Sequence, residues 1–89
     1  MLDDTIAAVS TALGEAAISV LVDARKRQGL TQRELEGRMG ETHHGLVAKI
    51  ETRERQINLI EFIGWARAVG LDEVDLFRNV LAALPPASE

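Results

Sequence analysis

The chain has 89 residues, 46% of them apolar, with no cysteine and a net charge of −4. This length allows one small domain with a modest core, the apolar content argues against disorder, and the missing cysteines exclude disulfides and thiolate chemistry. The longest near-continuous apolar run, residues 16–22, is too short to cross a membrane. The first residues also lack the basic-then-apolar layout of a signal peptide, so we expect a cytoplasmic protein with no membrane partner.

Charge is distributed unevenly along the chain. Residues 1–20 carry three acids and no base, residues 21–55 carry eight bases and six acids, and residues 56–89 carry two bases and five acids. The positive surplus therefore lies in the middle of the chain. A local basic surface matters more than net charge for contact with phosphates, whereas acidic flanks suit a protein partner.

Apolar spacing predicts a first helix over residues 4–28, with a continuous stripe formed by Ile6, Val9, Leu13, Ala17, Val20 and Ala24. Gly14 lies midway and is a potential break. Ile18 and Val22 lie off this stripe, on a second face. Two alternatives remain for that face: it is covered within the monomer by the N-terminal arm or the last helix, or it belongs to a subunit interface.

Two short helices joined by a tight turn follow over residues 30–55. Gly29 ends the first helix, and Thr31 with Glu34 forms the capping box of the second. Leu35 and Met39, four residues apart, give that helix one buried side. Gly40 stops it, and Thr42 is the expected cap of a third helix with apolar residues Leu46, Val47 and Ile50.

Two further helices complete an all-α prediction of five helices. Asn58 and Glu61 form a capping box for the fourth, with Trp65 at the edge of an apolar face made by Leu59, Phe62, Ile63, Ala66 and Val69. Asp72 caps the fifth, which ends before Pro85 and whose expected inward residues are Val74, Phe77, Val80, Leu81 and Leu84. Leu76 and Ala83 lie to one side of the fifth helix. They form a second candidate dimer interface, in addition to Ile18 and Val22.

The central segment resembles the helix-turn-helix of the phage Cro and repressor (XRE) family, which also includes restriction controllers and antitoxins. The resemblance rests on Gly29-Leu30-Thr31-Gln32, Leu35, Gly40 and Val47-Ala48-Lys49-Ile50-Glu51, and covers roughly residues 16–76. It implies a five-helix lambda-repressor-like DNA-binding domain over residues 16–84, with residues 1–15 as a helical extension and 85–89 as a tail. The chain departs from the family pattern by six rather than five residues between Gly40 and Val47, by Glu36 in place of a small residue, and by Gly45 within the recognition helix.

The resemblance also implies roles for individual residues. Candidates for base contact lie at the start of the recognition helix: Thr42, His43, His44, Gly45 and Ala48. His44 is favoured because it occupies a reading position whether one counts from Gly40 or from Val47. Candidates for backbone phosphate contact are Gln32, Arg38, Lys49, Arg53 and Arg55. The alternative for each is an ordinary solvent-exposed side chain with no role in binding. Arg25 and Glu51 are expected to form a structural ion pair between the first and third helices.

No residue pattern supports an enzyme or a cofactor site. Adjacent histidines on a helix point about 100° apart and seldom share one metal ion, so we expect no metal at His43 and His44. The favoured function is a homodimeric transcriptional repressor that binds an inverted repeat in double-stranded DNA. The alternative is a helix-turn-helix module for protein contact, such as an antitoxin or an antagonist of another regulator.

Overall fold

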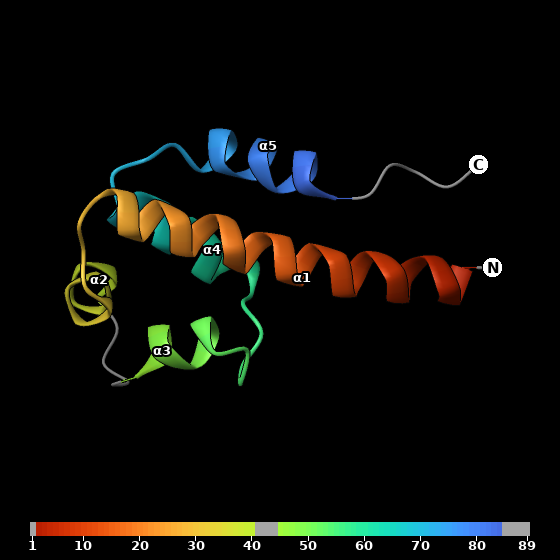
Figure 1. The fold of residues 1–89 in the computed structure, drawn as a ribbon, viewed down its shortest axis with the longest axis horizontal. Coiled ribbons are helices and arrows are strands. Elements are labelled where there is room, and N and C mark those ends of the chain that lie inside the picture. Colours follow the sequence, from red (N-terminus) through yellow and green to blue (C-terminus); the bar gives the residue numbers. More distant parts are fainter. Residues whose placement is uncertain (1, 41–44, 85–89) are drawn as a thin grey trace.

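The computed structural model describes residues 2–40 and 45–84, which form five helices and no strand (Figure 1). The helices are α1 (Leu2–Arg27), α2 (Gln32–Met39), α3 (Leu46–Glu51), α4 (Leu59–Ala68) and α5 (Glu73–Ala83). The long α1 packs against α3, α4 and α5, while α2 packs against α3 and α4. The all-α, five-helix prediction is therefore confirmed.

Local signals in the sequence set most helix ends. Thr31 with Glu34 and Asn58 with Glu61 form complete capping boxes at the starts of α2 and α4. Asp72 caps α5 by accepting a hydrogen bond from the Val74 amide. Each of these caps satisfies backbone amides that the first helical turn leaves without a partner.

The core lies where the C-terminal half of α1 meets the other helices. Trp65 of α4 is fully buried at its centre, and its indole Nε1 donates to the Leu21 carbonyl of α1 at 3.1 Å. The expectation of Trp65 at the edge of its helix face is therefore wrong. Helix α1 runs through Gly14 without a break, so its first turns extend beyond the other helices (Figure 1), leaving Ile6 and Val9 exposed.

Helix α5 is rotated relative to the predicted inward face. Leu76 and Val80, four residues apart, are buried, whereas Val74, Phe77 and Leu81 are 53%, 38% and 50% exposed. The prediction placed these last three inward, which is wrong. Helix α5 carries two apolar strips at helical spacing, and its packing on α1 and α4 decides which strip is buried.

The predicted dimer-interface residues differ in their burial. Ile18 and Leu76 are 4% and 6% exposed in the chain's own core, so they are not available to a second subunit and their assignment is wrong. Val22 is half-buried against the same core and Ala83 is exposed. The second face of α1 at Ile18 is thus covered within the monomer, the first of the two alternatives.

By length and apolar composition alone, residues 6–27 of α1 would suffice to cross a membrane. The longest near-continuous apolar run within it, residues 16–22, is much shorter. In the structure, Ala17, Leu21 and Ala24 of this helix are buried against the other helices. The core helix of a soluble protein meets the same two criteria, although only 22% of the apolar window in α1 is buried in this structure.

Candidate nucleic-acid interface

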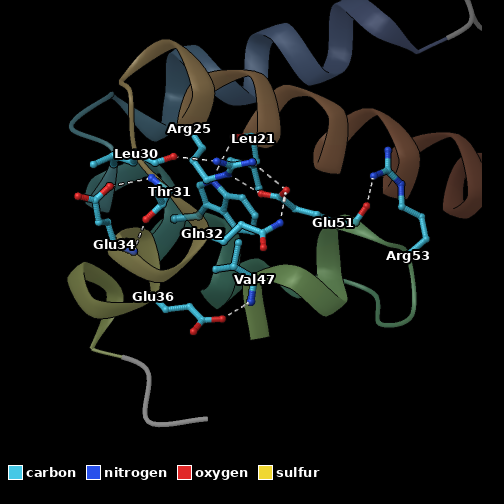
Figure 2. A network of polar contacts seen from close by, with 11 residues as sticks. Leu21, Arg25, Leu30, Thr31, Gln32, Glu34, Glu36, Val47, Glu51 and Arg53 are labelled. Carbon is cyan, nitrogen blue, oxygen red and sulfur yellow. Dashed lines mark hydrogen bonds and ion pairs between the residues drawn. The ribbon is translucent and has the colours of Figure 1, made fainter. Parts of the chain in front are cut away.

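Helices α2 and α3 form the helix-turn-helix, and both ends of α2 are fixed locally. Figure 2 shows the capping box at its start. The Thr31 hydroxyl accepts from the Glu34 amide at 3.1 Å, and the Glu34 carboxylate accepts from the Thr31 amide at 2.8 Å. The Thr31 backbone hydrogen bond lowers the pKa of Glu34 below its usual value. Helix α2 ends at Gly40, whose φ of 73° lies in the left-handed region that glycine adopts without strain.

Helix α3 begins later than predicted. Its first residue is Leu46 and its N-cap is Gly45, at φ 88°, so the expected start near Thr42 is wrong; Thr42 itself lies outside the described residues. Gly45 has no side chain with which to cap the helix. The buried carboxylate of Glu36 on α2 does so instead, accepting from the Val47 amide at 2.8 Å and the Gly45 amide at 3.3 Å (Figure 2).

Glu36 was identified in the sequence only as a departure from the family pattern. A carboxylate that accepts amide hydrogen bonds at a helix start is favoured by both hydrogen bonding and the helix dipole. The available signal was an acid at position 36 together with Gly45, which has no side chain to accept a hydrogen bond at the start of the next helix. Glu36 therefore joins α2 to the first turn of α3.

The last residue of α3 is held by a buried network (Figure 2). The Arg25 guanidinium of α1 donates from Nε and Nη2 to the two Glu51 oxygens at 2.7 and 3.0 Å, and from Nη1 to the Leu30 carbonyl at 2.7 Å. Gln32 of α2 donates to the same Glu51 carboxylate at 2.8 Å. The expected Arg25–Glu51 pair is present, and it ties α1, α2 and α3 together at one point.

The predicted base-contact residues divide into two groups. Thr42, His43 and His44 lie outside the described residues. Gly45 and Ala48 are half-exposed, while Leu46, Val47 and Ile50 point into the core. Ala48, with the exposed Lys49 beside it, therefore marks the outward side of α3.

The predicted phosphate contacts mostly have partners within the chain. Gln32 is committed to Glu51, and the exposed Arg38 donates to the Ala68 carbonyl at 3.3 Å. Arg53 donates from Nε to Glu15 of α1 at 3.1 Å, and Arg55 donates to Glu61 of α4 at 2.9 Å. These hydrogen bonds raise the pKa of Arg53 and lower those of Glu15 and Glu61.

Two cationic side chains near the motif differ from these arginines in their pairing. Lys49 on α3 and Arg33 on α2 are exposed, and neither takes part in an ion pair among residues 2–40 and 45–84. Arg33 was not among the predicted contacts, because the sequence could not show which arginines would form ion pairs with carboxylates. Within the same part of the chain, no group of histidine and acidic side chains could hold a metal ion.

Comparison with known proteins agrees with this geometry. Residues 21–76 match the model of the helix-turn-helix family. An XRE-family like protein from Pseudomonas syringae pv. tomato is similar in structure, with a TM-score of 0.80, 32% sequence identity, and coverage of 92% of this chain and 99% of the other. A comparison with curated proteins found no match.

The fold and its motif thus define a helix-turn-helix regulator, a DNA-binding rather than an enzyme fold. The chain belongs to the helix-turn-helix family, of the XRE type.

Proposed function

We propose that the chain is a sequence-specific transcriptional repressor that places α3 in the major groove of DNA. The observation that supports this most directly is the way α3 is held. Glu36 binds its first turn and Arg25 with Gln32 binds its last residue, all from the protein side, so Ala48 and Lys49 remain on the outward side. A short helix fixed at both ends can present side chains to base edges at small entropic cost.

The repressor is proposed to act as a homodimer on an inverted repeat. One short helix offers too few base contacts for specificity, so helix-turn-helix dimers read two half-sites about one duplex turn apart. The proposed base contacts are His44 first, and with it Thr42, His43, Gly45 and Ala48. Lys49, Arg33 and Arg38 are the proposed phosphate contacts, with Arg53 and Arg55 contributing if they exchange a carboxylate for a phosphate.

The test uses a binding site selected from random DNA or taken from the DNA upstream of the gene. His44→Ala should reduce the preference for that site over a scrambled duplex at least tenfold. Lys49→Ala should weaken binding to both duplexes alike and reduce the salt dependence by about one phosphate contact. If His44→Ala left the preference unchanged, His44 would have no base contact; if wild type showed no preference, the function itself would be wrong.

A second function, binding to another protein as an antitoxin or antagonist, is favoured by one observation. The charges around α3 suit a polyanion poorly. Glu36 places a buried carboxylate at the start of α3, and Arg53 and Arg55 are already paired with acids. With a net charge of −4, this weakens the attraction to a polyanion. Stoichiometric co-purification of a partner, with no gel shift on upstream DNA at moderate salt, would favour this function over the first.

A further inference from the structure

A cavity of about 470 Å³ lies between the middle of α1 and the loop that follows α3. Its apolar walls include Leu13 and Ile18 of α1, Phe62 of α4 and Phe77 of α5. The two phenylalanine rings meet edge to face, with their centroids 5.9 Å apart. Small-molecule sites have this range of volume and a mostly apolar lining, to which a few polar groups are added that fix the orientation of the ligand.

Gly14, in the middle of α1, is one of the residues that line this cavity. Glycine inside a helix is less stable than alanine, yet α1 runs through Gly14 without a break. Neither backbone nor packing requires glycine here, because its φ is not positive and a Cβ placed on it would meet no atom within 4 Å. What glycine provides at this position is open space, which a side chain would fill.

The polar group of the cavity is the guanidinium of Arg53, from the loop after α3. Its Nη1 donates to the Glu51 carbonyl at 2.5 Å, which fixes the position of the guanidinium (Figure 2). Its Nε and Nη2 donate to the two carboxylate oxygens of Glu15, another lining residue, at 3.1 and 2.5 Å. This pair of parallel donors is the arrangement with which arginine binds a carboxylate of any origin.

Glu15 is a partner that another carboxylate can replace. Its side chain is 61% exposed, and solvent weakens an ion pair of this kind. Arg55 also lines the cavity but is held differently, since its partner Glu61 is only 14% exposed and accepts from the Asn58 amide at 3.0 Å as well. Arg53 is therefore the cation of the cavity that is open to exchange.

We propose that this cavity binds a small carboxylic acid with an apolar body. The carboxylate of the ligand replaces that of Glu15 on Arg53, and its body packs on Phe62 and Phe77. Since Arg53 is also a proposed phosphate contact, the acid and DNA compete for it, and the acid is an effector that weakens DNA binding. The effector role rests on the proposed function, whereas the binding of the acid does not.

The first test is isothermal titration calorimetry of the full chain with 4-phenylbutyrate. Wild type should bind one molecule with a dissociation constant of about 1 mM or below, as expected for a ligand of about twelve non-hydrogen atoms. The alcohol 4-phenylbutan-1-ol lacks the carboxylate and acetate lacks the apolar body, so each should bind at least tenfold more weakly. No binding of 4-phenylbutyrate, or equal binding of either control compound, overturns the proposal.

The second test fills the cavity. Gly14→Leu should weaken the binding of 4-phenylbutyrate at least tenfold, and the smaller Gly14→Ala should act in the same direction. Gly37→Leu is the matched control, because Gly37 is a helical glycine with equally open space that does not line the cavity. Thermal unfolding checks that the variants fold, and none should melt below wild type, since both replacements favour a helix more than glycine does. If Gly14→Leu binds like Gly37→Leu, the cavity is not the site.

The third test concerns the exchange on Arg53. Glu15→Gln should bind 4-phenylbutyrate several-fold more tightly, because the competing carboxylate is gone. Arg53→Gln should bind it no better than the alcohol. Glu54→Gln should match wild type, since Glu54 is an exposed acid that does not line the cavity. A Glu15→Gln protein that binds the acid no more tightly than Glu54→Gln contradicts the exchange.

The outcomes for the acid and for DNA are separable. Saturating 4-phenylbutyrate should lower the affinity for a selected duplex several-fold, and the duplex should weaken the binding of the acid by the same factor. A chain that binds the acid but prefers no duplex would refute the repressor function and leave the cavity standing. A chain that prefers a duplex but binds no acid would refute the cavity alone, and one that binds both without mutual effect would refute the effector role.

Discussion

Glu36 illustrates how one side chain can set the position of a functional helix. Gly45 gives α3 no side-chain cap, and the Glu36 carboxylate replaces it from the neighbouring helix. Glu36→Ala should lower the free energy of unfolding by about 1–2 kcal/mol, the usual cost of losing a helix cap. Urea denaturation measures this loss.

The matched control is Glu36→Gln, which keeps an acceptor oxygen at the same reach and should lose less than half as much. Equal losses for the two substitutions would show that the amide hydrogen bonds to Val47 and Gly45 contribute little.

At the same scale, we expect Glu15 to compete with DNA for Arg53, one of the proposed phosphate contacts. The two side chains are 61% and 39% exposed and form an ion pair that water and salt weaken. Glu15→Gln should leave the Arg53 guanidinium for a phosphate, raise non-specific DNA affinity several-fold and steepen the salt dependence by about one contact. Fluorescence anisotropy over a range of salt concentrations measures both.

Glu54→Gln is the control for this prediction. Glu54 is an exposed acid next to Arg53 in the loop after α3, and its described hydrogen bond is with Thr52, not Arg53. Should Glu15→Gln and Glu54→Gln bind DNA with the same salt dependence, Arg53 would have no part in phosphate contact.

At the scale of the elements, the Arg25–Glu51 fork holds three helices together. Both side chains are about nine-tenths buried. Glu51→Ala leaves a buried guanidinium without its carboxylate and should cost about 3 kcal/mol of stability, since breaking a buried ion pair is far more costly than losing an exposed one. Thermal or urea unfolding checks this against Glu54→Ala, expected within about 0.5 kcal/mol of wild type. Similar stabilities for the two variants would contradict a structural role for the fork.

The helix ends were predictable from sequence because caps are local. Thr31 with Glu34 and Asn58 with Glu61 satisfy backbone amides three residues away, so short sequence patterns suffice to identify them. The Arg25–Glu51 pair spans 26 residues and followed only from the family resemblance. The capping of α3 by Glu36 was missed because it links two helices across a turn of altered length.

The faces of α5 were not predictable by the same means. Val74, Phe77 and Leu81 and the pair Leu76 and Val80 both have helical spacing, and only packing against α1 and α4 selects the second set. The candidate site had a similar limit. Charge counting identified the basic segment, but not which of its arginines are paired with Glu15 and Glu61.

At the scale of the whole molecule, acid should destabilise the fold. The pKa values of Glu34, Glu61 and Glu73 are lowered from the ordinary value of 4.5 by hydrogen bonds, to Thr31 for the first and to Arg55 and Arg67 for the others. A carboxyl whose pKa is lower in the folded state binds protons more weakly there than in the unfolded state. Its stabilisation is thus complete above about pH 4.5 and is lost as pH falls through the folded pKa.

Urea midpoints should therefore change little between pH 7 and 5.5 on account of these groups and fall steadily below pH 4.5. In Glu61→Gln, which lacks one of the three carboxyls, the fall should be shallower. A midpoint that rises on acidification from pH 5 to 3, or an identical fall in both proteins, would contradict the assignment.

The central claim is that the outward side of the helix-turn-helix, held from within by Glu36 and the Arg25–Glu51 fork, is the DNA-binding surface. Amide chemical shifts of the labelled protein, titrated with a selected duplex at moderate salt, test it most directly. We predict that the largest changes fall on Gln32, Arg33 and residues 45–49, with Val74 and Leu81 unaffected. Changes centred on α4 and α5, or none that distinguish the selected duplex from a scrambled one, would contradict it.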